Sequence, residues 1–213
     1  MDVDVIFEDS DIVVVDKPAG MIVHAAPGHE EGALADELVR RFPGMAKVGS
    51  AERPGVVHRL DIETSGVMVF AKTQRAYLAL RRQFESHRDV CKTYLAVVHG
   101  TPKPKAGTID TPVGRDHLSA VTHWKVLASH NGISLVEFKI DTGRMHQIRI
   151  HAAKLGCPVV GDRTYGSVER DRHMRRRPAR LLLHAAELSF LHPVTGRRVT
   201  FSSPPPDDIV YAG

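Results

Sequence analysis

The chain has 213 residues, of which 42% are hydrophobic and 25% are charged, and these proportions are typical of a globular protein with a buried core. Its most apolar stretch near the N-terminus, residues 12–15, is far shorter than a signal-peptide core or a membrane span. The two cysteines form no CxxC pair, so they support neither a disulfide framework nor a cysteine-rich metal site. We expect a soluble cytoplasmic protein with no membrane partner, and we expect a monomer.

The first half of the chain predicts strands and helices joined by short turns. In chain order these are a strand at 13–15, a tight turn at 16–20, a strand at 21–23, a helix with Leu34, Leu38 and Phe42 on one face, a loop at 49–55, a strand at 67–72 and a helix with Ala76, Leu80 and Phe84 on one face. Pro43 ends the first helix because proline cannot continue it. Thr73 can cap the N-terminus of the second helix.

The second half of the chain predicts more strand than helix. The elements are strands at 91–98, 122–127 and 132–140, a short helix with Ile148, Ala152 and Leu155 on one face, and strands at 187–191 and 197–201. Gly156 and Pro158 end the helix. Because regular βαβ alternation is absent, we predict a single α+β domain over residues 1–213, with a mostly antiparallel central sheet flanked by helices and loops.

The net charge of +4 is concentrated in one segment. Residues 169–180 hold six arginines and two acids, an excess equal to the whole net charge. One interpretation is a solvated loop. The other is a loop that contacts phosphates, because clustered arginine supplies the salt-dependent, sequence-independent part of nucleic-acid affinity.

The 13 histidines raise the question of a metal site. The sequence contains no HExxH motif, and His146 and His151 are five residues apart, which disfavours joint ligation from a regular helix or strand. We therefore expect no metal and no cofactor.

Asp61 is the first candidate for a chemical role. It lies in a polar loop immediately before a predicted buried strand, and loops held by rigid elements often carry functional residues. An aspartate in a loop is also a common turn or capping residue, because its carboxylate accepts hydrogen bonds from nearby backbone amides. Both interpretations remain open on this evidence.

Arg144 and Arg149 lie at the predicted start of a helix, where a cation is unfavourable against the positive end of the helix dipole. An anionic partner is therefore expected. A catalytic carboxylate needs such a cation to stay ionised in a closed pocket, but an ordinary structural ion pair explains the pattern equally well. Tyr94, on a predicted strand, similarly fits either sheet packing or stacking on a flipped base.

Long sequence strings settle the choice, because the sequence resembles the RluA-type family of pseudouridine synthases from about residue 7 to about residue 206. The strings are residues 16–20, 58–61, 64–66, 92–96, 142–151, 155–158, 161–162, 165–166 and 182–185. The resemblance implies the pseudouridine synthase fold with a central active-site cleft. It also implies an isomerase that acts on uridines of structured ribosomal or transfer RNA after base flipping.

The resemblance further implies roles for individual residues. Asp61 is the implied catalytic aspartate, Tyr94 the tyrosine packed against the target uracil, and Arg149 the basic partner of the carboxylate. The implied substrate-binding residues are Arg59, which holds the displaced base, together with Ile150, Arg144 and His58.

Many relatives in this family carry a small N-terminal RNA-binding domain, and we expect none here, so RNA selection rests on the catalytic domain. The alternative function is a non-catalytic RNA-binding module of the same fold. Release of tritium from uracil labelled at carbon 5 distinguishes the two, since a pure binder releases none.

Overall fold

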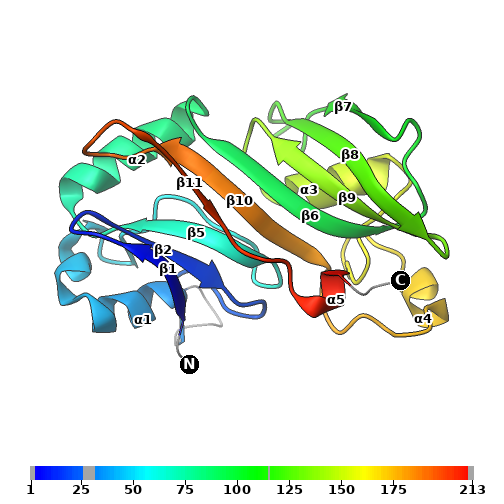
Figure 1. Cartoon of the computed structure of the whole chain (residues 1–213), viewed down its shortest axis with the longest axis horizontal. Helices are drawn as coiled ribbons and strands as arrows, with labels where there is room; N and C mark the ends of the chain where they lie inside the picture. Colours follow the sequence, from blue (N-terminus) through cyan, green and yellow to red (C-terminus); the bar gives the residue numbers. More distant parts are fainter. Residues whose placement is uncertain (1–2, 26–31, 115, 211–213) are drawn as a thin grey trace. The chain divides into compact units, whose positions relative to one another are not determined.

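The computed structural model describes residues 3–25, 32–114 and 116–210, which fall into two compact units (Figure 1). Unit 1 comprises Met1–Val90 and Glu187–Ser203, and unit 2 comprises Cys91–Ala186 and Pro204–Gly213. Strand β10 (Leu183–Leu191) carries the chain from unit 2 into unit 1.

Unit 1 combines antiparallel strands with two helices. Its elements are β1 (Asp4–Glu8), β2 (Ile12–Lys17), α1 (Leu34–Arg41), the 3-10 helix η1 (Pro43–Lys47), β3 (Gly49–Ser50), β4 (Arg53–Pro54), β5 (Ser65–Ala71), α2 (Gln74–Ser86), the second part of β10, and β11 (Arg198–Ser202). Strand β2 pairs antiparallel with β1 on one side and with β5 on the other, and β10 pairs antiparallel with β11.

The core of unit 1 follows from its most apolar segments. All seven residues of β5 are buried, as expected for a strand covered on both faces. Helix α2 packs against β5 and buries Ala76, Leu80 and Phe84. The side chain of Thr73 caps this helix by accepting a hydrogen bond from the Ala76 backbone amide at 3.3 Å, as the sequence predicted.

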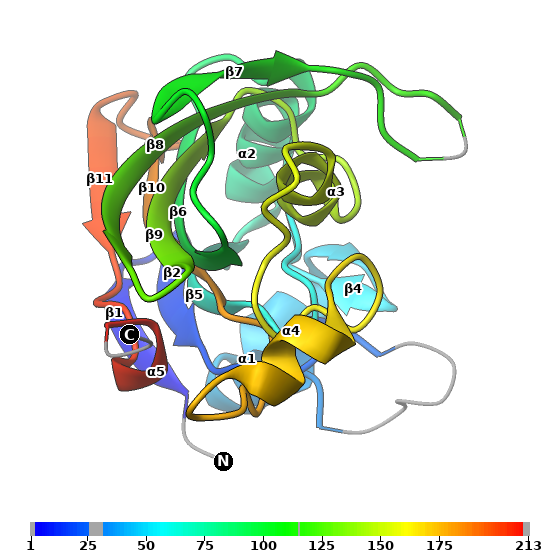
Figure 2. The same cartoon turned by 90° about the vertical axis from the view of Figure 1, so that its right-hand side faces the viewer.

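Unit 2 is built on an antiparallel sheet in the order β6-β9-β8-β7. Its elements are β6 (Cys91–His99), β7 (Ala106–Asp110), β8 (Val121–His130), β9 (Ile133–Ile140), α3 (Gln147–Lys154), α4 (Val168–His173), the first part of β10, and α5 (Asp207–Val210). Figure 2 shows α3 on the concave side of the curved strands, and α3 contacts β8. Asn131 and Gly132, both with positive φ, form the hairpin between β8 and β9.

The core of unit 2 gathers residues from distant parts of the sequence. One buried cluster consists of Val97, Ile133, Val160, Leu182 and Ile209. Ile209 belongs to α5. This helix is too short to be stable by itself, so the apolar packing of Ile209 stabilises it.

The predicted fold class is confirmed, because helices accompany a mostly antiparallel sheet. The expected strand at residues 21–23 is wrong, since these residues form no strand. Their carbonyls serve α1 instead: the amides of Leu34 and Ala35 donate to the oxygens of Ile22 and Val23 at 2.9 and 3.0 Å. The expected loop at 49–55 contains the small hairpin β3–β4. No helix among the described residues is long and apolar enough to cross a membrane.

Candidate active site

The loop that carries Asp61 lies in unit 1, immediately before β5. Its backbone turns sharply, with the Thr64 amide donating to the Asp61 carbonyl at 3.1 Å. The next carbonyl, that of Ile62, accepts from the Gly20 amide at 2.8 Å. The Asp61 side chain is half-buried. The loop backbone around Asp61 is therefore fixed.

Lys17 adds a second restraint on this loop from β2. The side chain is fully buried, and its ammonium donates to three backbone carbonyls: Pro18 at 2.9 Å, Met21 at 2.8 Å and Ile62 at 3.0 Å. A buried charge is costly unless its donors are satisfied, and these carbonyls satisfy it. The Met21 carbonyl thus accepts a hydrogen bond from Lys17 and not from a neighbouring strand.

His58 and Arg59 precede the catalytic candidate in the same loop. His58 is half-buried, accepts a hydrogen bond at Nε2 from the Val69 backbone amide at 3.2 Å, and stacks on Phe84 with ring centroids 4.5 Å apart. These contacts anchor the loop to β5 and α2. Arg59 is exposed and, in the part of the chain that the structure describes, has neither a hydrogen-bond nor an ion-pair partner. Its guanidinium is available to a ligand.

Arg149 lies in the first turn of α3, in unit 2, and is buried. Its Nε and Nη2 donate to the two carboxylate oxygens of Asp162 at 2.7 and 2.8 Å, a bidentate ion pair. Burial alone raises the pKa of the Asp162 carboxyl, but hydrogen bonds from Arg149 and from two backbone amides outweigh it, and the pKa is lowered. The expectation that an anion compensates this helix-start cation is confirmed.

Asp162 was not singled out as a site residue by the sequence, although it lies in one of the strings that carry the family resemblance. It also accepts hydrogen bonds from the Thr164 and Tyr165 amides at 2.9 and 3.0 Å. The Tyr165 ring in turn lies 5.3 Å from the Arg149 guanidinium carbon, and its hydroxyl hydrogen-bonds His146 Nδ1 at 3.2 Å. Arg149 is thus held by a carboxylate and an aromatic ring that Asp162 organises.

Gln147 fixes the backbone at the beginning of α3. Its side-chain oxygen accepts from Thr142 Oγ1 at 2.7 Å and from the Arg144 amide at 3.0 Å, and its nitrogen donates to the Val121 carbonyl and Thr122 Oγ1. The half-buried Arg144 differs from Arg149, because its Nε donates to the Ser119 carbonyl at 3.1 Å instead of a carboxylate.

Tyr94 and Lys92 occupy the same face of β6, because side chains alternate along a strand. Tyr94 is buried and lies opposite Phe138 in the sheet register. The pKa of Lys92 is lowered to about 8, mainly by burial; Asp141 opposes the change and the nearby Arg144 adds to it. The Lys92 ammonium donates to the Thr142 carbonyl at 3.3 Å, which ties β6 to the start of α3.

The predicted site residues divide between the two units. Unit 1 holds His58, Arg59 and Asp61, and unit 2 holds Tyr94, Arg144, Arg149 and the half-buried Ile150. Within residues 3–25, 32–114 and 116–210, no group of three or more His, Cys, Asp or Glu side chains is arranged to hold a metal ion. Among the predicted catalytic residues, Asp61 offers a carboxylate, Arg149 a guanidinium and Tyr94 a phenol.

Residues 11–154, which include Asp61, Tyr94 and Arg149, match the sequence profile of the family described as RNA pseudouridylate synthase. The chain belongs to this family. The chain is similar to an uncharacterized RNA pseudouridine synthase of Synechocystis, at 38% identity over 95% of this chain and 65% of that protein. It is also 36% identical to the ribosomal large subunit pseudouridine synthase D of Zymomonas mobilis, over 97% of this chain and 70% of that protein.

Solved structures agree with the family. The human RNA pseudouridylate synthase domain containing 4 aligns with a TM-score of 0.75 and 27% identity, covering 98% of this chain and 91% of that one. The two curated relatives are longer than this chain, which spans about two thirds of their length.

Proposed function

We propose that this chain converts uridine to pseudouridine in RNA, with the Asp61 carboxylate as the catalytic group. Family membership carries the proposal, because the matched region includes Asp61 together with Tyr94 and Arg149. The anchored backbone around a half-buried Asp61 supports it, since a catalytic group must be held at a defined position. The compartment we propose is the cytoplasm, and the protein acts as a monomer.

The reaction breaks the bond between N1 of uracil and C1′ of the ribose, turns the base, and joins C5 to C1′. The proton that leaves C5 balances the one that N1 gains, so no cofactor or redox change is needed. The uridine must first leave the RNA stack, at a cost of a few kcal/mol. Asp61 either attacks the sugar or base covalently or assists cleavage of the glycosidic bond.

In this proposal Arg149 is the basic partner of the Asp61 carboxylate. Asp162 holds the Arg149 guanidinium in one orientation. Tyr94 stacks on the uracil, and either its hydroxyl or a water removes the proton from C5.

The remaining residues of the site bind the RNA around the reacting base. Arg59, which is exposed, holds the displaced base out of the stack. Ile150 lines the uracil pocket, and Arg144 and His58 complete the substrate-binding surface.

Ribosomal RNA is the substrate class that the relatives favour. The Zymomonas mobilis relative is named for the large ribosomal subunit, which supports ribosomal RNA ahead of transfer RNA. Mapping of pseudouridines in cellular RNA identifies the target uridine.

Tritium release from RNA transcribed with uridine labelled at carbon 5 tests the proposal. The wild-type protein is expected to release tritium, and Asp61→Asn is expected to release none while binding RNA with unchanged affinity. Glu63→Gln is the matched control, because it removes a negative charge from the same loop, and it should retain activity. Turnover by Asp61→Asn contradicts the proposal, and RNA binding by the wild type without any release identifies a non-catalytic RNA-binding module.

A further inference from the structure

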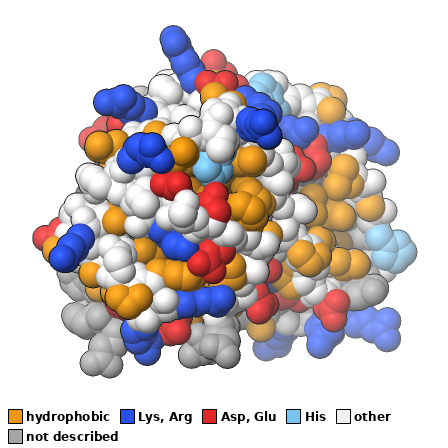
Figure 3. All heavy atoms as spheres, turned by 60° about the vertical axis from the view of Figure 1, so that its left-hand side comes forward, with side chains coloured by type: hydrophobic (Ala, Val, Ile, Leu, Met, Phe, Trp, Pro, Cys, Tyr) orange, Lys and Arg blue, Asp and Glu red, His pale blue; other side chains and the backbone are white. Residues whose placement is uncertain are grey.

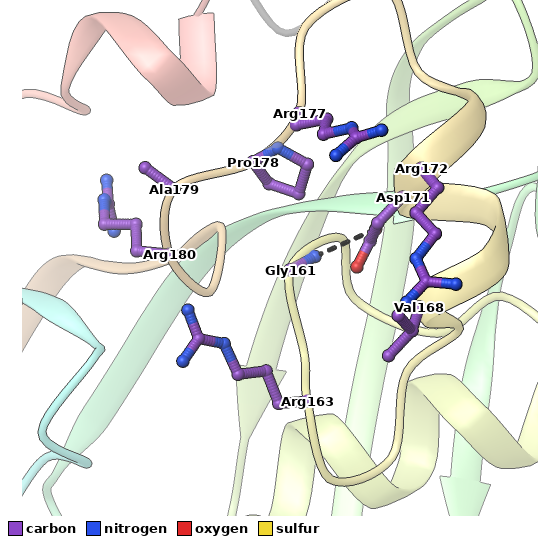
Figure 4. A pocket seen from close by; sticks show the side chains of 9 residues that line it. All are labelled: Gly161, Arg163, Val168, Asp171, Arg172, Arg177, Pro178, Ala179 and Arg180. Carbon is purple, nitrogen blue, oxygen red and sulfur yellow. Dashed lines mark hydrogen bonds between the residues drawn. The ribbon is translucent and has the colours of Figure 1, made fainter.

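Unit 2 contains a pocket of about 220 Å³ whose lining is dominated by arginine (Figure 4). Arg163, Arg172, Arg177 and Arg180 surround it, and Asp171 is the one acid among the lining residues. The pocket is formed within one continuous stretch of the chain, residues 161–180, by the loop after Gly161, α4 and the segment that follows α4. It contains part of the segment from which the net positive charge of the chain arises.

The walls of this pocket are fixed by internal hydrogen bonds. Arg180 donates from Nε and Nη2 to the carboxylate of Asp208 and from Nη1 to the Leu181 carbonyl. Asp171 Oδ1 accepts from His99 Nε2 at 2.7 Å and from the Gly161 amide at 3.2 Å. Arg180 and Asp171 therefore serve as framework.

Gly161 makes the frame compact. A Cβ atom at this position would lie 1.9 Å from the Arg180 carbonyl oxygen, and the residue has a positive φ of 78°. Only glycine permits this close approach of two backbone segments. The approach brings the Arg163 and Arg180 loops to the same pocket.

The other three lining arginines have no such internal role. Arg163, Arg172 and Arg177 are exposed, and in the part of the chain that the structure describes none of them has a carboxylate within ion-pair distance. Figure 4 shows their side chains arranged around the pocket from three different segments. Like charges gathered in this way repel one another unless an anion lies between them.

The distribution of charge elsewhere is different. On the face drawn in Figure 3, Lys and Arg side chains are interspersed with Asp and Glu. A mixed surface of this kind is ordinary for a soluble domain. A pocket lined by four arginines and one acid, which is itself hydrogen-bonded within the protein, is unusual. Such a pocket favours a ligand with several anionic oxygens.

We propose that this pocket binds a phosphodiester group of the RNA substrate, through Arg163, Arg172 and Arg177. The inference rests on the proposed function, because RNA is then the polyanion that the protein meets. Arginine binds phosphate oxygens through two parallel hydrogen bonds, so exposed guanidiniums around this pocket favour a phosphate group, with specificity for the backbone and not for the base. In this proposal residues 169–180 contact phosphate, in line with the second of the two interpretations of this segment, and are not merely a solvated loop.

The test compares two double variants in one segment. Arg172→Gln/Arg177→Gln removes two charges that line the pocket, and Arg175→Gln/Arg176→Gln removes two exposed charges that do not. Binding of a fluorescein-labelled single-stranded RNA of 20 nucleotides is measured by anisotropy at several salt concentrations. Because phosphate contacts are independent of sequence, this probe needs no knowledge of the target uridine.

The pocket variant is expected to lower affinity roughly tenfold and to reduce the slope of log affinity against log salt by up to about 0.7, since the loss of one phosphate contact removes about 0.7. The control variant is expected to change the slope much less, and both variants should melt at the wild-type temperature. Equal effects of the two variants, or none from either, overturn the proposal. Saturable binding of inorganic phosphate in this pocket, with an unchanged RNA slope in the pocket variant, overturns it too, in favour of a small-anion site.

This test is separate from the test of catalysis. The salt slope needs no turnover, so the pocket comparison holds even for a protein that releases no tritium. Conversely, tritium release by the wild type with identical slopes for the two double variants refutes the phosphate pocket and leaves the proposed function intact.

Discussion

In unit 1 the loop that carries Asp61 is held through the neutral carbonyl of Ile62, one of three backbone carbonyls that accept hydrogen bonds from Lys17. In unit 2 the start of α3 is held by a buried ion pair, in which Arg149 donates twice to Asp162. One region thus anchors the backbone around a half-buried acid. In the other region the Asp162 carboxylate fixes the Arg149 guanidinium.

The difference decides how sensitive each region is to substitution. Removing one partner of a buried ion pair leaves an uncompensated charge in the interior. Removing a buried donor to carbonyls leaves neutral acceptors, which costs less. The start of α3 should therefore depend more strongly on its electrostatic partner than the Asp61 loop does.

Asp162→Asn is the change with the largest expected effect. We expect it to reduce the free energy of unfolding by about 3–5 kcal/mol, because it removes one partner of a buried, bidentate ion pair. Denaturation by urea measures the loss. Asp141→Asn is the surface control, since its contact with His123 is exposed to solvent, and it should cost less than about 1 kcal/mol.

The double variant Arg149→Met/Asp162→Asn separates a structural role of this ion pair from a catalytic one. It removes both charges and leaves a side-chain oxygen for the Thr164 and Tyr165 amides, so most of the lost stability should return. If Arg149 also acts on the Asp61 carboxylate, tritium release stays absent in the stable double variant. Restored activity would reduce Arg149 to a structural residue.

Lys17→Met tests the carbonyl-held loop of unit 1. Three buried carbonyls lose a charged donor, and we expect a loss of about 1–3 kcal/mol in the free energy of unfolding. Tritium release at a temperature where the variant is folded should also fall, because the loop around Asp61 loosens. Lys47→Met, at an exposed position, is the control. A stability loss larger than that of Asp162→Asn would contradict the expectation that the start of α3 depends more strongly on its electrostatic partner than the Asp61 loop does.

Acid should weaken unit 2 through Asp162, whose pKa in the folded protein lies below its ordinary value of 3.8. A carboxyl with a lowered pKa stabilises the fold above its unfolded pKa, and this stabilisation disappears as the pH falls through the folded pKa. The free energy of unfolding should therefore drop below about pH 4, by up to about 1.4 kcal/mol per pH unit. Arg149→Met/Asp162→Asn lacks this group, and identical acid curves for it and the wild type would refute the assignment.

Thr73→Ala has the smallest expected effect and lies away from both regions. The loss of the α2 cap should cost about 1 kcal/mol, and Thr73→Ser should restore it. Tritium release at 25 °C should match the wild type. A large loss of activity would mean that the N-terminus of α2 supports the Asp61 loop in addition to the His58–Phe84 contact.

Elements with strong periodicity were predicted from the sequence, because one pattern determines both their type and their burial. Strand β5, helix α2 with its Thr73 cap, and the end of α3 at Gly156 are examples. Strands β1 and β7 were missed because each lies at an edge, alternates exposed with half-buried residues, and lacks an apolar run. The local apolar pattern of residues 21–23 was misleading, since the partners of its carbonyls come from α1 and Lys17.

The candidate site likewise contains residues that the sequence predicted and one that only the structure revealed. Asp61, Tyr94 and Arg149 were identified through long sequence strings, and physical reasoning added that Arg149 needs an anion. Which of the acids supplies it depends on a contact across 13 residues, from α3 to the loop after Gly161. No helical or strand spacing encodes that contact, so Asp162 emerged only from the structure.

The central claim is that Asp61 carries out uridine isomerisation in RNA, and pseudouridine mapping in total cellular RNA tests it most directly. Cells lacking the gene are compared with cells that express the wild type or Asp61→Asn at equal level. We predict at least one pseudouridine, in ribosomal RNA, that requires the wild type and that Asp61→Asn does not restore. Restoration of every such site by Asp61→Asn, or a map that is the same with and without the gene, would contradict the account.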